Sequence, residues 1–215
     1  MSDSPTIDIF LHENKPEQSF QELLTALNTQ AIPLLTRKGT VLQYATDEIK
    51  YCYLLHKGHV VINRTIDGLS LNSETAPFVF GFSMLSDIPC QLTLCTSADA
   101  VVSRLPLGEA MDIIQQHVLW EPLSHVMVHI SSRIFTHCTR LSQPGAYGAI
   151  RYLLFDLSLE SDEFRKSESV VNYVQNRCFL SRSGIMAVLS TLRRGNYIEI
   201  NNGKLIKINY LPTKF

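Results

Sequence analysis

The pattern of residues 169–215 constrains the fold of this chain more than any other feature. An amphipathic segment that begins at Ser169 is followed by the apolar-periodic run SRSGIMAVLSTLRR and then by YIEINNGKLIKINYLP. The first two segments predict two helices joined by a tight turn, and the third predicts a β-hairpin. Two helices closed by a hairpin form a winged helix-turn-helix, a unit that places its second helix in the major groove of DNA.

The second predicted helix has a recognisable start, end and buried face. Ser181 precedes it, and its hydroxyl can accept a hydrogen bond from a free backbone N–H of the first turn. Apolar residues at three- and four-residue steps predict one buried stripe, formed by Ile185, Val188, Leu189 and Leu192. Arg193 and Arg194 suit the negative end of the helix dipole, and Gly195 with Asn196 can end the helix.

The charges of this region match a phosphate backbone. Residues 169–215 contain seven Lys or Arg and one acidic residue, Glu199. The candidate DNA contacts lie in the turn, at both ends of the second helix, on its exposed face and in the wing: Arg177, Ser181, Arg182, Ser183, Met186, Arg193, Arg194, Lys204 and Lys207. A protein-interaction module, in which Arg182 is only a solvated charge, is the alternative. We favour DNA because helix, turn, wing and charge agree.

The predicted wing turns at Asn201-Asn202-Gly203. Asn-Gly between two alternating runs is a strong signal for a β-hairpin. We expect Ile198 and Ile200 to share one face of the hairpin, and Ile206 and Ile208 to share one face as well.

Charge is spread unevenly along the 215 residues, whose formal net charge is only −1. Residues 1–141 carry −5 and residues 142–215 carry +4. This asymmetry suggests a regulatory domain joined to a DNA-binding domain. No apolar run is long enough to cross a membrane, and residues 1–15 lack the pattern of a signal peptide. We therefore expect a cytoplasmic protein without a membrane partner.

The chain has five cysteines, an odd number without a CxxC motif, which fits a reducing compartment. Cys90 and Cys95 are the only close pair. Buried, inert thiols are the preferred interpretation of that pair, and a redox or metal role is the alternative. Cys178 lies within the predicted helix-turn-helix, where oxidation would disturb DNA contacts.

Residues 36–105 predict an antiparallel barrel or jelly roll. Short apolar runs alternate there with turns such as Lys57-Gly58 and Asp67-Gly68. The amphipathic segment 16–30 predicts a helix across one end of the strands.

A short helix at 108–119 and a long helix that begins near Pro122 follow the predicted strands. A near-heptad apolar pattern along the long helix suits a homodimer contact. The predicted dimer residues are Leu123, Val126, Met127, Ile130, Ile134 and Leu141. In the alternative, the helix only packs on its own barrel. The sequence SQPGAYG then breaks the helix and predicts a hinge near residues 142–145.

Taken together, these segments resemble the Crp/Fnr family of bacterial transcription regulators. YLLHKGHVVI, the following Asp-Gly and FVFGF are similar to the cyclic-nucleotide-binding-type β-roll, and LSRSGIMAVLSTLRRGNYIEINNGKLI is similar to the recognition helix and wing. The resemblance implies an α+β fold, with a β-roll at 1–120, a dimerisation helix at 121–141 and a winged helix-turn-helix at 142–215. It further implies a homodimeric regulator of stress, including oxidative stress, or virulence genes. Double-stranded DNA is the expected partner and RNA polymerase a candidate partner.

Departures from the family pattern bear on ligands. Members that bind cyclic nucleotides have a Gly-Glu pair and, later, an Arg-Ser pair that holds the phosphate. This chain has Gly81-Phe82 and Cys90-Gln91 instead, so that Phe80, Gly81, Phe82, Cys90 and Gln91 outline a degenerate ligand pocket. A buried phosphate without a cation is costly, so we do not expect cyclic AMP to bind. An iron–sulfur cluster is also not expected, because residues 1–51 contain no cysteine.

The helix-turn-helix departs from the family as well. Gln175 and Phe179 replace a small residue and a turn glycine of the relatives, while Ser183 and Ala187 replace an acidic residue and an arginine of the recognition helix. Arg182 matches the arginine of the family that contacts bases. The preferred DNA site should therefore differ from that of the family.

Histidines offer the remaining site hypotheses. His125 and His129 have the i,i+4 spacing of a metal pair, but no carboxylate or thiol on that helix completes a site, and a structural role is preferred. His56 or His59 could bind haem, as in gas-sensing relatives. A haem-, metal- or small-ligand-binding sensor that acts through protein contacts is thus the second functional hypothesis. The sequence contains no catalytic motif, so we predict that the protein is not an enzyme.

Overall fold

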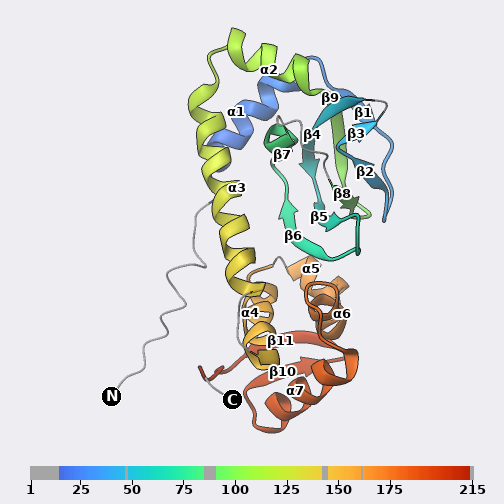
Figure 1. The fold of residues 1–215 in the computed structure, drawn as a ribbon, viewed down its shortest axis with the longest axis vertical. Coiled ribbons are helices and arrows are strands. Elements are labelled where there is room, and N and C mark those ends of the chain that lie inside the picture. The colour runs from blue at the N-terminus through green and yellow to red at the C-terminus, as the bar shows by residue number, and fades with distance from the viewer. Residues whose placement is uncertain (1–14, 47, 85–90, 142–144, 161, 214–215) are drawn as a thin grey trace. The chain divides into compact units, whose positions relative to one another are not determined.

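The computed structural model describes residues 15–46, 48–84, 91–141, 145–160 and 162–213 (Figure 1). The chain divides into two compact units, and the division falls between Ile134 and Phe135, within one long helix. The first unit is a β-roll with helices, and the second is a helical unit with a two-stranded hairpin. The predicted domain limits at 120/121 and 141/142 stay a prediction.

The described strands of the β-roll unit form two antiparallel sheets. In the first sheet the order is β1-β9-β4-β3, with β7 on β4; in the second it is β2-β8-β5-β6. The strands are β1 (Ile32–Leu34), β2 (Val41–Gln43), β3 (Ala45–Thr46), β4 (Ile49–Lys57), β5 (His59–Arg64), β6 (Ser70–Thr75), β7 (Phe78–Phe80), β8 (Leu92–Thr96) and β9 (Val101–Pro106). A 3-10 turn, η1 (Phe82–Met84), follows β7. The predicted jelly-roll-like architecture is confirmed.

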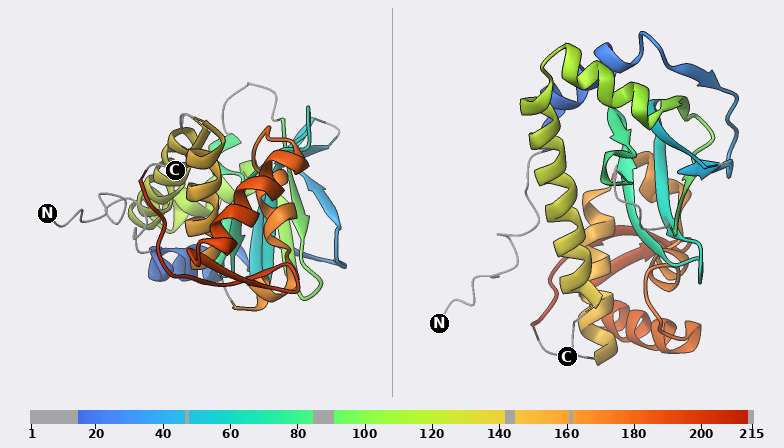
Figure 2. Two further views of the ribbon diagram at one scale, coloured as in Figure 1. Left: turned by 90° about the horizontal axis from the view of Figure 1, so that it is seen from below. Right: turned by 45° about the horizontal axis from the view of Figure 1, so that its top comes forward.

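Three described helices accompany these strands: α1 (Glu17–Leu27), α2 (Leu107–Gln116) and α3 (Trp120–Leu141). Helix α2 lies at one end of the strands, whereas α3 runs lengthwise beside them (Figures 1 and 2). Both sheets and all three helices contribute side chains to one apolar core. Phe20 of α1, for example, stacks on Phe78 of β7 with ring centroids 4.5 Å apart. The amphipathic segments predicted at 16–30 and 108–119 therefore form helices because their apolar faces complete this core.

Most of the residues of α3 that were predicted to form the dimer contact pack inside the protomer instead. Leu123 and Val126 are buried in the core of the β-roll unit, and Met127 and Ile130 pack against that core. This is a correction to the predicted dimer contact, and its cause is that the apolar stripe of α3 closes the open side of the roll. Ile134 is exposed, and the side chain of Leu141 lies outside the described part of the structure.

A different stripe of α3 faces solvent. Its members are spaced by alternating four- and three-residue steps and are all exposed: Ser124, Val128, Ser131, Phe135 and Cys138. Val128 and Phe135 are each 61% exposed. The hinge predicted at 142–145 falls on residues 142–144, which lie outside the described residues, and a new helix begins at Gly145.

Polar groups also fix α3 to the roll. The guanidinium Nε of Arg133 donates to Glu74 Oε1 at 3.3 Å, and Glu74 accepts a further hydrogen bond from the Asn72 amide on the same strand, β6. The ammonium of Lys15, just before α1, donates to the carbonyl of Thr75 and lies 5.1 Å from the ring centroid of Phe20. Burial lowers the pKa of Lys15 to about 8, although Glu74 and Glu17 oppose the shift and Arg133 adds to it.

In its described residues, the second unit has four helices after α3 and one hairpin (Figure 1). They are α4 (Gly145–Leu159), α5 (Asp162–Ser167), α6 (Val170–Gln175), α7 (Arg182–Arg194), β10 (Ile198–Asn201) and β11 (Lys204–Ile208). Helix α4 contacts α6, α7 and β11 and buries Ile150, Leu153, Leu154 and Leu157. Helix α4 has no clear signature in the sequence, because glycines at 145 and 148 indicate a break and its apolar residues form no single narrow stripe.

The hairpin turn is formed as predicted. Asn202 and Gly203 both have positive φ, at 47° and 76°, which is the geometry that makes Asn-Gly suitable for a tight hairpin. The prediction of which β11 side chains face the core was wrong. A register shift between Glu199 and Ile200 pairs Ile200 with Leu205, so that Leu205 is buried and Ile206 is 53% exposed.

The end of the chain is attached to α4. The hydroxyl of Tyr147 donates to the carbonyl of Pro212 at 2.6 Å, and Nε of Arg151 donates to the carbonyl of Leu211 at 3.3 Å. Arg151 is buried, with its guanidinium 5.2 Å from the ring centroid of Phe155, and Leu211 is buried as well. Leu211, beyond the second strand, is thus part of the core of this unit.

Candidate nucleic-acid interface

The predicted helix-turn-helix consists of α6 and α7, and a serine caps each helix. The side chain of Ser169 accepts from the backbone N–H of Asn172, and that of Ser181 accepts from the backbone N–H of Gly184. A serine cap of this kind stabilises a helix by about 1 kcal/mol. At the other end of α7, Asn196 has a positive φ of 57°, which ends the helix at the predicted place.

One face of α7 is buried and the opposite face is exposed. Ile185, Leu189 and Leu192 are at most 4% exposed, and they hold the helix against α4 and α6. The exposed face carries the predicted contacts Ser181, Arg182, Ser183 and Met186 in its first two turns, and Arg193 and Arg194 at its end. The interface residues predicted on α7 therefore share one accessible face, as major-groove binding requires.

Arg182 lies at the start of this face. Its Nη1 donates to Asn172 Oδ1 at 3.3 Å and to Gln175 Oε1 at 3.2 Å. Both acceptors are neutral amides on α6, so they orient the guanidinium without cancelling its charge. Sequence reasoning missed these two residues as partners of Arg182, because no sequence pattern links an arginine to amides seven and ten residues earlier across a turn.

The two wing lysines differ in accessibility. Lys204 is half-buried, and its ammonium donates to the carbonyl of Ser167 at 2.9 Å, which attaches the wing to the end of α5. Lys207 is exposed and stands opposite Glu199 in the hairpin register. Lys207 is therefore the more accessible of the two cations for a phosphate.

Arg177 was predicted to contact DNA, and the structure corrects this. Its side chain is 3% exposed, its Nη1 donates to the carbonyl of Tyr173, and its guanidinium lies 3.7 Å from the centroid of the Tyr173 ring. A side chain held in this way cannot reach a phosphate without leaving the core. Arg177 is a packing residue of the turn between α6 and α7.

The thiols near these elements are shielded. The Sγ of Cys178 donates to the carbonyl of Val174, and burial raises the pKa of this thiol. Burial also raises the pKa of Cys52 in the β-roll. Since the thiolate is the reactive form, both positions are poor targets for oxidation. Cys95 is half-buried and Cys138 is exposed, while Cys90 lies outside the described residues.

In the β-roll, three of the five positions predicted for the degenerate ligand pocket are buried. Phe80 and Phe82 are buried, and Gly81 has φ +114° with the backbone carbonyl of Tyr51 only 2.5 Å from where a Cβ would lie. Gln91 is exposed, and its carbonyl accepts from the backbone N–H of Thr65. Cys90, the remaining predicted position, lies outside the described residues.

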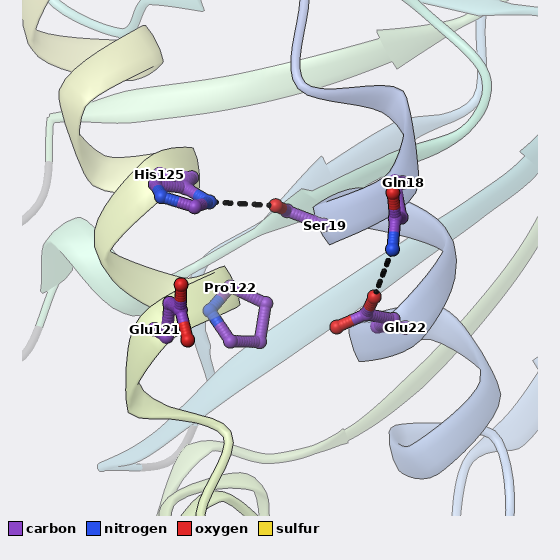
Figure 3. A pocket seen from close by; sticks show the side chains of 6 residues that line it. All are labelled: Gln18, Ser19, Glu22, Glu121, Pro122 and His125. Carbon is purple, nitrogen blue, oxygen red and sulfur yellow. Dashed lines mark hydrogen bonds between the residues drawn. The ribbon is translucent and has the colours of Figure 1, made fainter.

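A small polar pocket of about 340 Å³ lies between α1 and α3 in the β-roll unit (Figure 3). Its lining comprises Gln18, Ser19, Glu22, Glu121, Pro122 and His125. His125 Nδ1 lies 3.0 Å from Ser19 Oγ, and Gln18 Nε2 donates to Glu22 at 2.9 Å. Four of the polar side chains around this pocket thus bond to one another in two pairs, one of which links α1 to α3.

The i,i+4 histidines of α3 lie in different environments. His125 is exposed at the pocket, whereas His129 is buried against the rings of Phe20 and Phe78. Within the described ranges, no group of three or more His, Cys, Asp and Glu residues is arranged to hold a metal ion. In the same part of the chain, no helix is both long enough and apolar enough to span a membrane.

Comparison with known proteins agrees with this geometry. Residues 146–213 match a protein family described as winged helix-turn-helix DNA binding, which covers α4 to the hairpin. The chain is 29% identical over 212 residues to the inhibitor of hydrogen peroxide resistance of Salmonella typhimurium, covering 94% of this chain and 98% of that protein.

Two solved structures share the fold across both units. The c-di-GMP-responsive global regulator CLP of Xanthomonas campestris has a TM-score of 0.68 at 14% identity, covering 89% of this chain and 100% of that one. A transcriptional regulator of the Crp/Fnr family from Eubacterium rectale has a TM-score of 0.63 at 13% identity, covering 91% and 92%. The predicted resemblance to Crp/Fnr regulators and the predicted fold are confirmed. Residues 146–213 thus correspond to a DNA-binding winged helix-turn-helix domain.

Proposed function

We propose that this chain, which has the fold of the Crp/Fnr regulators, is a homodimeric, cyclic-AMP-independent transcription factor that controls genes for peroxide or related stress. The observation that carries the proposal is the exposed face of α7, with a capped first turn, Arg182 at its start and Arg193 and Arg194 at its end. Arg182 has the fork geometry that binds guanine through two hydrogen bonds.

Fewer basic side chains are accessible to DNA than the sequence suggests. Arg151 and Arg177 are buried, and Arg165 pairs with Asp162. Arg182, Arg193, Arg194 and Lys207 are exposed and supply the accessible positive charge of α7 and the wing. Because these cations would bind phosphates, the affinity for DNA should fall as the salt concentration rises. A dimer would make twice as many phosphate contacts as one protomer.

A second copy of the chain would bind along the exposed stripe of α3. The stripe Ser124, Val128, Ser131, Phe135 and Cys138 has the alternating spacing of a two-stranded helical contact. Paired α7 helices one helical turn of DNA apart would then recognise a near-palindromic site.

Independence from cyclic AMP is inferred from the β-roll. Phe82 is buried where the relatives that bind the nucleotide carry a carboxylate, and Gln91 supplies no cation for a phosphate. Titration of the full chain with cyclic AMP should therefore produce no binding heat and no change in DNA affinity. The link to peroxide rests on the similarity to the inhibitor of hydrogen peroxide resistance. Such a regulator would act in the cytoplasm, with RNA polymerase as a candidate partner.

The direct test is binding of the full chain to DNA selected from a random pool. Arg182→Ala should lose about 1–3 kcal/mol of discrimination between the selected site and unrelated DNA. Arg64→Ala is the matched control, because Arg64 lies on β5 in the β-roll unit and is paired with Asp67. If Arg182→Ala kept full discrimination, α7 would not be the element that recognises bases. If no sequence were enriched from the pool, the proposal of a site-specific regulator would fail.

A further inference from the structure

The exposed face of α7 has an unusual chemical composition for a surface that meets DNA. Arg182, Ser183, Met186, Ala187 and Ser190 are all exposed, whereas Ile185, Leu189 and Leu192 are buried. Arg182 is the only charged side chain among these five. Met186 is 50% exposed, and the contacts that hold α7 in the unit are made by its other face.

Met186 and Ala187 lie one helical turn after Arg182 and Ser183. Residues four apart lie on the same side of a helix, displaced along its axis by about 6 Å. That displacement corresponds to about two base-pair steps of DNA. An apolar surface therefore follows the guanidinium at a distance of roughly two base pairs.

Only one group on the major-groove edges of the bases matches such a surface. The thymine C5-methyl is the apolar group among those that identify a base pair in the major groove, and the other identifying groups are hydrogen-bond donors or acceptors. A flexible methionine adapts to irregular apolar contacts, and alanine permits close approach. Ser183 in place of an acidic side chain leaves no carboxylate to accept a hydrogen bond from cytosine N4.

The two amides of α6 add a second element of selectivity. Hydrogen bonds from Nη1 of Arg182 to Asn172 Oδ1 at 3.3 Å and to Gln175 Oε1 at 3.2 Å orient the guanidinium. Because both contacts use Nη1, the other guanidinium nitrogens remain available for the two acceptors of guanine.

From these observations we infer that α7 recognises a half-site with one guanine bound by Arg182 and, about two base pairs away, thymine methyl groups packed against Met186 and Ala187. Asn172 and Gln175 are positioning residues for the guanine contact. This inference rests on the proposed function and specifies the DNA sequence class that the regulator binds.

The test removes the methyl group alone. The full chain is titrated with its selected site and with the same site in which each thymine in turn is replaced by deoxyuridine, which lacks only the C5-methyl. Wild-type protein should bind the critical deoxyuridine site roughly fourfold more weakly, the effect expected for one buried methyl. Met186→Ala should bind both sites with nearly equal affinity. Leu159→Ala, which shortens another exposed apolar side chain of the same unit, should keep the wild-type difference.

A second substitution in the DNA tests the amides. Replacing the critical guanine by 7-deazaguanine removes the N7 acceptor, and this should weaken binding by the wild-type protein. The double variant Asn172→Ala/Gln175→Ala should show a smaller loss with 7-deazaguanine but retain the full sensitivity to deoxyuridine. A merely structural role of the amides would lower affinity for all these sites alike, and this result would overturn their assignment as positioning residues.

The outcomes separate this inference from the proposed function. If wild-type protein bound thymine and deoxyuridine sites equally while still selecting a sequence, the methyl contact would be wrong and the DNA-binding regulator would stand. If no sequence were selected at all, the proposed function itself would be wrong.

Discussion

Two arginines of the helix-turn-helix, five residues apart, have opposite environments. Arg177 is buried on the ring of Tyr173, and Arg182 is exposed at the start of α7. The sequence could not distinguish them, because both are basic residues in a basic segment. Their burial depends on which side of the turn after α6 faces the core, and only the packed structure determines that.

Arg177→Ala should therefore act on stability and not on recognition. Loss of a buried hydrogen bond and a stacked cation should lower the free energy of unfolding by about 1–3 kcal/mol. Urea denaturation of the full chain measures this. Arg182→Ala is the control and should leave the urea midpoint nearly unchanged. Equal midpoints for wild type and Arg177→Ala would contradict the packing role.

Among the elements, α3 shows how far a periodic pattern can be interpreted. The apolar repeat correctly predicted a long helix, but it could not identify which surface the apolar stripe covers. Leu123 and Val126 complete the core of the roll, and the exposed stripe contains serines that weaken its apolar signal in the sequence. Similarly, the register shift at Glu199 and Ile200 buries Leu205 of the wing and leaves Ile206 exposed. Alternation of apolar residues alone does not reveal such a shift.

The proposed dimer contact can be tested at Phe135. Phe135→Glu places a charge in the exposed stripe of α3, so the protein should sediment as a monomer where wild type sediments as a dimer. The matched control is Ile66→Glu, which makes the same kind of change at an exposed apolar residue of a β-roll turn. A dimer that survives Phe135→Glu as well as Ile66→Glu would exclude this stripe as the interface.

At the scale of the whole molecule, the sequence predicted the order of the structural elements better than the contacts between them. The strand pattern, the long helix and the wing appeared where expected, because each has a local signature in turns, caps or periodicity. Helix α4 and the Arg133–Glu74 contact have no such signature, since they depend on residues that are distant in the chain. The sequence overstates the accessible positive charge of the second unit, because Arg151 and Arg177 are buried.

The stability of the whole chain should depend on pH through Lys15. Its folded-state pKa, about 8, lies below the ordinary value of 10.5 because burial disfavours the ammonium. Between these values the unfolded chain binds more protons, so the free energy of unfolding should rise with pH across this window. Lys15→Met should reduce that rise, as measured by urea denaturation at several pH values. Lys57→Met, at an exposed position of β4, should retain it.

The attachment of the chain's end to α4 has a practical consequence for experiments on isolated pieces. A fragment cut after Ile208 would keep every helix and both strands of the wing but lose the carbonyls of Leu211 and Pro212. The guanidinium of Arg151 would then lose a hydrogen-bond acceptor, and the unit would lose the buried side chain of Leu211. Such a fragment should be recovered mainly as insoluble material, whereas one extended to residue 213 should give dispersed amide resonances. An affinity tag should accordingly not be fused directly after the second strand of the wing.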